Sequence, residues 1–293
     1  MSTSNKYFIL TADDFGMSET YDNAVLTGYL EGFLTSACIC TNGLSYDYAL
    51  SYVLPKCENI DLGVHLNIIE GKSLTDCPLL TDEEGYFRYG FLSLLLKSQG
   101  LSRKKFLNQV ELEFRAQIEK LKNDLRSLSG RHQIVFLNSH VHTHAIENIF
   151  EITARLSREY GIKFIRTQSE KLYTSGEAVQ VPRFVNILKV LILNYLSLKN
   201  RKRVEKYGLL TNDYILGVGY TGEMSEDTIY CGAKSLSGAK FGSIVEALIH
   251  PSDDKYADEA RYREFEASLS LRLKEDIEKL GFKVSGFRNL SEE

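Results

Sequence analysis

Long apolar runs are absent from this chain. The most apolar segment, VNILKVLILNYLSL at 185–198, contains a lysine and two asparagines. It is shorter than the roughly 20 apolar residues that a membrane helix needs, so we predict a buried helix and no membrane partner. The amino terminus reaches charged residues too early for a signal peptide, whose apolar core spans roughly 7–15 residues.

A disulfide framework is not expected either. The five cysteines, at 38, 40, 57, 77 and 231, are odd in number and form no CxxC pair. Cys38 and Cys40 alternate within a predicted strand, where we expect them to fill the core. A cytoplasmic location, where thiols stay reduced, is the natural setting for such a chain.

An excess of basic charge is also missing. The chain has 35 Lys and Arg against 39 Asp and Glu, with a net charge of −4. Nucleic-acid binding needs a clustered basic surface, so we expect no nucleic-acid partner. The one dense basic run, LKNRKRVEKYG at 198–208, is typical of a solvated helix face.

The sequence does contain a regular alternation of strand and helix patterns. Near-continuous apolar runs indicate strands buried on both faces. They lie at 6–11, 35–42, 60–68, 133–140, 162–168, 214–220, 242–250 and 282–290. Apolar residues at helical spacing predict helices between them. These are 18–33, which starts at the N-cap Ser18, then 101–130, 147–161 and 257–281, each of the last three ending at a glycine.

This alternation predicts an α/β fold, a (β/α) barrel of seven or eight strands in regular or distorted form. The usual size of such a barrel is about 250 residues, so we predict one domain over 1–293. Segments 70–100 and 169–213 are predicted insertions near the loops that cover the site. A doubly wound open sheet is the alternative. The first strand, however, is followed by no Gly-rich phosphate loop, which counts against a nucleotide-binding sheet.

Polar residues gather at the predicted carboxyl ends of the strands, where barrel active sites form. Five of the six histidines lie there, and only His132 precedes its strand. The residues concerned are Asp13, Asp14, His65, His140, His142, His144 and His250. Their convergence is the main sequence evidence for a functional site.

A metal site is the first interpretation of this cluster. Alternate side chains of an extended segment share a face, so His140, His142 and His144 would point into one pocket. A carboxylate with two imidazoles leaves coordination positions open for water and substrate, and Asp14, His65 and His140 would supply it. The alternative is that these histidines cap strands and hydrogen-bond to the backbone.

The remaining polar residues suggest acid–base roles. Asp13 is the candidate base for water activated by the metal, and His250 the candidate acid. Glu246, four residues earlier on the strand, would orient His250. Arg166 would pair with a catalytic carboxylate or hold substrate. Structural ion pairs, or a turn capped by Asp14, are the competing explanations.

Five motifs resemble those of the YdjC-like carbohydrate deacetylases. They are TADDFGMSETYDNAV, LGVHLNI, NSHVHTH, IKFIRTQSE and EALIHPS, which occur in the family's order over residues 7–253. The resemblance implies a barrel-like fold, often dimeric, that removes N-acetyl groups from amino sugars with a divalent metal. It implies Asp14, His65 and His140 as metal ligands, Asp13 as base and His250 as acid.

The sequence departs from this family at Asn138, where an aspartate is often found. If that carboxylate orients a metal-binding histidine, an amide orients it less strongly and weakens metal affinity. For His142 and His144, the resemblance leaves sugar contact and support of the metal ligands both open.

We therefore predict a metal-dependent hydrolase that removes the acetyl group from a small N-acetylated sugar, with one divalent ion, magnesium or zinc first. A metal-dependent phosphoesterase, another amidohydrolase and a non-catalytic metal- or carbohydrate-binding protein are the alternatives. Residues 138–144 contain no lysine or arginine, which favours a neutral substrate over a phosphate. A homodimer is expected from the resemblance alone.

Overall fold

The computed structural model describes residues 5–128, 132–176 and 181–290, and within them the strands form one parallel sheet. The strands are β1 (Lys6–Phe15), β2 (Ser36–Ile39), β3 (Asp61–Leu66), β4 (Ile134–Ser139), β5 (Phe164–Ile165), β6 (Tyr214–Leu216), β7 (Ile244–Ile249) and β8 (Phe282–Val284). Their order is β5-β4-β3-β2-β1-β7-β6, and β8 pairs with β1. Each predicted apolar run therefore contains a strand.

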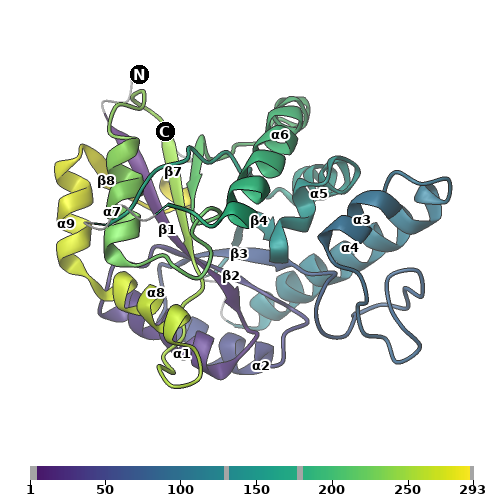
Figure 1. Cartoon of the computed structure of the whole chain (residues 1–293). Coiled ribbons are helices and arrows are strands. Elements are labelled where there is room, and N and C mark those ends of the chain that lie inside the picture. The colour runs from purple at the N-terminus through teal and green to yellow at the C-terminus, as the bar shows by residue number, and fades with distance from the viewer. Residues whose placement is uncertain (1–4, 129–131, 177–180, 291–293) are drawn as a thin grey trace.

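The sheet curls so that its two outer strands meet. The backbone N–H of Ile215 in β6 donates to the carbonyl of Ser169, just beyond β5, at 2.9 Å. Phe164 of β5 also bridges to Leu210, just before β6. The result is a (β/α)-barrel-like fold surrounded by helices (Figure 1), as the sequence predicted, and not an open doubly wound sheet.

The helices surround the strands in Figure 1. They are α1 (Glu19–Leu30), α2 (Tyr46–Tyr48), α3 (Phe91–Lys97), α4 (Arg103–Ser127), α5 (Glu147–Tyr160), α6 (Phe184–Tyr207), α7 (Glu226–Ser235), α8 (Glu259–Leu269), α9 (Leu271–Lys279) and α10 (Phe287–Leu290). The helix predicted over 257–281 is interrupted, because Ser270 leaves the helical conformation and its side chain accepts from the N–H of Leu273. The predicted end at Gly161 is confirmed by its left-handed φ of 73°. Gly130 lies outside the described residues.

The two predicted insertions have different structures. Segment 70–100 contains short antiparallel bridges, Lys72 to Tyr86 and Thr81 to Phe87, and then α3. Segment 169–213 carries α6, whose prediction as a buried helix is wrong for one of its sides. Val190 and Leu193 are buried, whereas Leu188 and Leu191 are 51% and 54% exposed. No helix of the described residues is long and apolar enough to span a bilayer.

The inside of the barrel is apolar at the amino ends of the strands. Ile9, Phe136, Phe164 and Phe287 form one buried cluster across β1, β4, β5 and α10. Gly63 of β3 is required here, because a Cβ would lie 2.6 Å from the ring of Phe136. Since side chains alternate along a strand, Asp13 follows Ile9 on the inward face of β1, four residues on. The polar site therefore lies nearer the carboxyl ends of the strands than this apolar cluster does.

Candidate active site

A buried ion network joins three strands at the carboxyl end of the barrel. The guanidinium of Arg166 donates to both carboxylate oxygens of Asp13, at 2.6 and 2.8 Å. It also donates to Oε1 of Glu246 through Nε at 3.0 Å and Nη2 at 2.6 Å. The side chains of Arg166 and Glu246 are fully buried. Two carboxylates thus share one arginine, whose planar fork holds the Asp13 carboxylate in a fixed orientation.

This network keeps Asp13 ionised. Burial alone would raise the pKa of its carboxyl, but the charge of Arg166, then that of His65, holds the pKa below its usual range. Oδ1 also accepts from Asn138 Nδ2 at 3.2 Å and from the thiol of Cys38 at 2.9 Å. Among the described residues, only Arg166 forms a hydrogen bond with Oδ2. The second lone pair of Oδ2 is therefore the best placed to accept a further proton.

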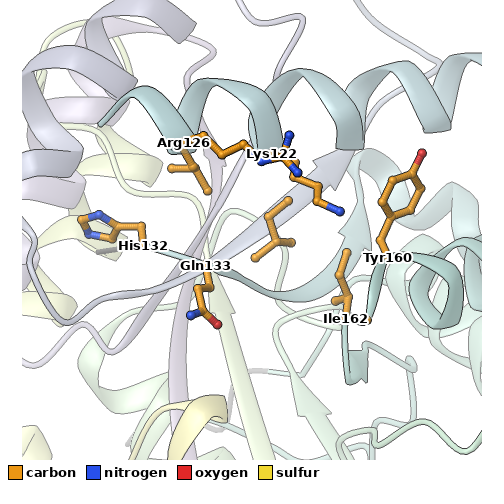
Figure 2. Close-up of a pocket in the computed structure, with 9 residues that line it drawn as sticks. Lys122, Arg126, His132, Gln133, Tyr160 and Ile162 are labelled. Carbon is orange, nitrogen blue, oxygen red and sulfur yellow. The ribbon is translucent and has the colours of Figure 1, made fainter. Parts of the chain in front are cut away.

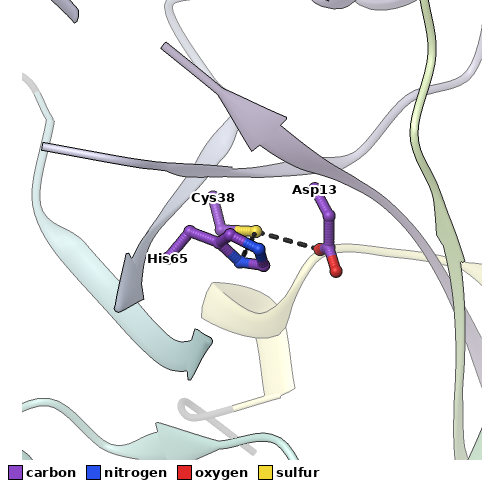
Figure 3. Close-up of side chains that lie close together, drawn as sticks. All are labelled: Asp13, Cys38 and His65. Atoms are coloured by element: carbon purple, nitrogen blue, oxygen red, sulfur yellow. Dashed lines mark hydrogen bonds between the residues drawn. The ribbon is translucent and has the colours of Figure 1, made fainter. Parts of the chain in front are cut away.

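Cys38 is buried in the core, as predicted, and it also belongs to the site. Figure 3 shows its sulfur between Asp13 and His65, and the Sγ–Nδ1 distance to His65 is 3.1 Å. Asn138 Oδ1 is 2.7 Å from the same Nδ1 of His65. An amide oxygen can only accept, so Nδ1 carries the proton and Nε2 is left free as a ligand. Burial, followed by the charge of Asp13, raises the pKa of the Cys38 thiol, which favours its neutral form.

The three predicted metal ligands meet at one carboxylate. Asp14 has a left-handed φ of 63°, and the pairing of β1 with β2 shifts register between Ala12 and Phe15. Adjacent residues of a regular strand point to opposite faces, so this turn allows Asp14 to line the same cavity as Asp13. Its Oδ1 lies 3.4 Å from His65 Nε2 and 2.8 Å from His140 Nδ1.

One carboxylate oxygen and two imidazole nitrogens suit a divalent cation such as zinc. The donors come together from the ends of three strands, so the residues fit such an ion. Among the described residues, the groups whose donor atoms all lie within 4.8 Å of one another are two different ones: Asp13, Cys38 and His65, and Asp14, Cys40 and His65. Their thiols are deeply buried with raised pKa values, which makes the thiolate form unfavourable.

Arg261 of α8 was not found from the sequence. Its Nη2 donates to Oδ2 of Asp14 at 3.0 Å, and its guanidinium lies over the ring of Tyr21 at 4.4 Å. With Oδ2 engaged, Asp14 offers Oδ1 to a cation. The spacing between residues 14 and 261 in the sequence does not predict the ion pair of Asp14 with Arg261.

The prediction that the three clustered histidines share one face is wrong. Residues His140–Ala145 form a 3-10 segment, and Val141 and His142 have φ values of 51° and 56°. His140 therefore reaches Asp14, while His144 turns inward, with Nδ1 2.6 Å from Ser139 Oγ and Nε2 2.9 Å from the carbonyl of Arg166. Burial lowers the pKa of His144 to about 3, so it stays neutral and supports the backbone of Arg166.

His142 has a different environment. It lines the site cavity but is only 5% exposed, and its Nδ1 has no hydrogen-bond partner within the described residues. Burial, followed by the charge of Lys189, holds its pKa well below the usual range. A neutral imidazole is thus held at the wall of the cavity.

His250 lines the same cavity from the end of β7. The partner predicted for it, Glu246, instead binds Arg166. Glu264 of α8 takes that place, with Oε2 3.5 Å from His250 Nδ1 and 2.5 Å from the backbone nitrogen of His250. Burial opposes protonation, but Glu264 and then Asp14 raise the pKa of His250 above its usual value.

The cavity itself has a volume of about 270 Å³. Asp13, Asp14, His140 and His250 line it, and so do Lys189 of α6 and Arg261. Basic residues thus line the cavity although residues 138–144 contain none, which weakens the sequence argument for a neutral substrate. Segment 169–213 brings Lys189 to the site.

Another cavity, of about 320 Å³, lies near the amino end of β4 and is lined by Lys122, Arg126, His132 and Tyr160 (Figure 2). His132 Nε2 is 3.0 Å from the carbonyl of Cys57. None of the predicted site residues lies there, so the functional interpretation rests on the first cavity.

Fold and site together define a class: (β/α)-barrel proteins with a carboxylate–imidazole cluster at the carboxyl ends of the strands. The particular family follows from comparison, since the family model described as YdjC-like protein matches residues 7–279. The chain belongs to the YdjC-like protein family.

Curated relatives carry the name carbohydrate deacetylase. A protein of Halalkalibacterium halodurans is 34% identical over 155 residues, 53% of this chain and 61% of the relative. A protein of Clostridium beijerinckii is 28% identical over 168 residues, 56% of this chain and 62% of the relative. The chain thus spans about three fifths of the length of these relatives.

Solved structures agree on the fold. An Enterococcus faecalis V583 protein, named as a candidate for cellobiose-phosphate cleavage, is 22% identical with a TM-score of 0.73. The match covers 98% of this chain and 99% of that chain. An uncharacterised protein of Agrobacterium tumefaciens C58 is 11% identical with a TM-score of 0.53, covering 99% and 91%.

Proposed function

We propose that this protein is a metal-dependent hydrolase that removes the acetyl group from a small N-acetylated amino sugar. One observation carries the proposal: Asp14, His65 and His140 converge beside an ionised Asp13, and His250 faces the same cavity. The name carbohydrate deacetylase of the curated relatives supports the substrate class.

Asp14 Oδ1, His65 Nε2 and His140 Nδ1 would hold the ion. A divalent cation bound there would supply Lewis acidity toward the amide carbonyl and toward water. Two imidazoles in the donor set favour zinc or a similar transition metal over magnesium. Asn138 contributes by fixing the His65 tautomer that presents Nε2.

Asp13 takes the proton from the attacking water, through Oδ2. Its depressed pKa makes it a weak base, but it is fully ionised at neutral pH and rigidly oriented by Arg166. His250, which lines the same cavity, gives a proton to the departing amine. Glu264 holds His250 and favours its protonated form, as a general acid requires.

The first test measures acetate release from N-acetylglucosamine and its short oligomers with zinc, magnesium or nickel added. Acetate release that needs the metal supports the proposal, and no release with any metal or sugar rejects it. Asp13→Asn should keep the metal and lose turnover, whereas a binding protein would be unaffected. The matched control is Asp47→Asn at an exposed aspartate outside the site.

A phosphoesterase is the second candidate, favoured by Lys189 and Arg261 in the cavity. Arg261, however, is paired with Asp14, which leaves less positive charge for a phosphate. Assay of p-nitrophenyl phosphate beside the acetamido sugars separates the two activities.

We further propose that α6 forms the interface of a homodimer. Its exposed apolar residues follow the 4-3-4-3 spacing of a helix-pairing seam: Phe184, Leu188, Leu191, Tyr195 and Leu198. Light scattering should find a dimer that Leu191→Lys converts to a monomer, and a monomeric native protein rejects this interface.

A further inference from the structure

The carboxylate of Glu70 lies at the edge of the proposed metal site. Glu70 follows β3 and begins the insertion 70–100. Its Oε2 is 3.3 Å from His140 Nε2, while Nδ1 of the same ring lies 2.8 Å from Asp14 Oδ1. One ring of His140 thus connects Asp14 to Glu70 through its two nitrogens.

The position of Glu70 is fixed although its side chain is 62% exposed. Its carbonyl accepts from Asn67 Nδ2 at 2.8 Å and Asn42 Nδ2 at 3.2 Å, and its own N–H donates to Asn67 Oδ1 at 3.1 Å. Asn67 is in turn held by the buried Gln117 of α4, whose Oε1 accepts from its backbone N–H at 2.9 Å. A rigid turn therefore presents the carboxylate to His140.

The two histidines proposed as metal ligands, His65 and His140, each have a second ring nitrogen that does not face the proposed metal. The partners of these two nitrogens differ in charge. His65 Nδ1 is bonded to Asn138, a buried neutral amide. His140 Nε2 faces a carboxylate. A carboxylate that accepts a proton from one imidazole nitrogen fixes the tautomer, orients the ring and makes the other nitrogen a better ligand. Glu70 is placed to supply the negative charge that Asn138 lacks.

We propose that Glu70 is a positioning residue that makes His140 offer Nδ1 to the metal and thereby strengthens metal binding. This inference rests on the proposed metal site. It assigns the first residue of the insertion to the assembly of the site, and not to substrate contact.

The test measures zinc affinity by competition with a chromophoric chelator over a range of pH, and compares the limiting affinities at high pH, where protons no longer compete with zinc for His140. Glu70→Ala should bind zinc about 10- to 100-fold more weakly than the native protein, the usual loss for such outer partners. Glu70→Gln, which keeps an acceptor but removes the charge, should lose less. Glu83→Gln, at an exposed glutamate of the same insertion, is the matched control and should bind zinc normally.

Two further readouts separate this role from others. The unfolding temperature of the metal-free Glu70→Ala protein should equal that of the native protein, and its kcat and KM should recover at saturating zinc. Unchanged zinc affinity in Glu70→Ala, or a raised KM with unchanged affinity, overturns the proposal. If the native protein binds no divalent ion at all, the proposed function fails with it, which is a different result from a failure of Glu70 alone.

Discussion

Arg166 binds Asp13 through two parallel hydrogen bonds of 2.6 and 2.8 Å, in a place where neither side chain is more than 2% exposed. The pair joins β1 to the end of β5, and Glu246 attaches β7 to the same guanidinium. The group that orients the candidate base thus also connects three strands of the barrel. A change at Arg166 should affect stability and turnover together.

Replacing Arg166 by methionine should destabilise the protein by about 3–5 kcal/mol, because two buried carboxylates lose the guanidinium that binds them both. Chemical denaturation of the metal-free protein measures this loss. Arg166→Lys should rescue it only in part, because an ammonium cannot reproduce the paired bonds to Asp13. Arg201→Met, at a partly exposed arginine of α6, is the control. A native-like free energy of unfolding in Arg166→Met would contradict the network.

The alkaline limb of the pH profile of activity should depend on Glu264. Because Glu264 and Asp14 raise the pKa of His250, His250 stays protonated above its ordinary range of about 6.5. Activity that needs this proton should persist above pH 6.5 and fall as pH rises through the raised pKa. Glu264→Gln should move that fall to lower pH with little change in zinc affinity. A pH profile of kcat/KM measures the shift, and identical alkaline limbs would remove Glu264 from this role.

Much of this site follows from where strands end. His65, His140 and His250 could be assigned because parallel strands of a barrel place their carboxyl ends on one face. The arrangement of residues 140–145 could not be predicted, because it depends on the left-handed backbone at Val141 and His142. A β-branched valine seldom adopts this backbone, so residue-type preference does not predict it.

The α8 residues that bind His250 and Asp14 could not be predicted from the sequence for another reason. Glu264 and Arg261 lie on a helix that reads as an ordinary amphipathic surface, and only the packing of α8 beside β7 brings them to the site. Glu70 was easier to find from the sequence, since it lies five residues after His65. Its function depends on the turn made by Asn67, which the residue spacing does not reveal.

Metal binding should release a proton from His140. Burial alone would lower the pKa of this histidine, but the hydrogen bonds to Asp14 and Glu70 raise it to about 9. A metal ligand must be deprotonated, so zinc affinity should rise by up to about tenfold per pH unit between pH 7 and 9. Calorimetry in buffers of different ionisation enthalpy measures the proton count.

The raised pKa of His140 predicts that the stability of the metal-free protein falls over the pH range in which zinc affinity rises. A group whose pKa is higher in the folded state stabilises that state fully below its unfolded value of about 6.5 and loses this contribution as pH rises to 9. The metal-free protein should therefore become less stable over this interval, and His140→Gln should remove that part of the slope. A pH-independent zinc affinity would contradict the assignment of His140 as a ligand.

Lys189 should determine how tightly the site binds negatively charged sugars. It reaches the cavity from α6, its Nζ lies 3.3 Å from Thr221 Oγ1, and no ion pair is recorded for it within the described residues. Burial lowers its pKa, as expected for a cation that lacks a close partner. An anionic group on the sugar would provide one. Lys189→Met should therefore raise KM about tenfold for a phosphorylated N-acetyl sugar, within the range of a charge-assisted hydrogen bond, and about twofold or less for the neutral sugar. Lys202→Met, at an exposed lysine of the same helix, should leave both KM values unchanged. Equal effects of Lys189→Met on the two KM values would mean that Lys189 shapes the cavity wall without interacting with the charge of the substrate.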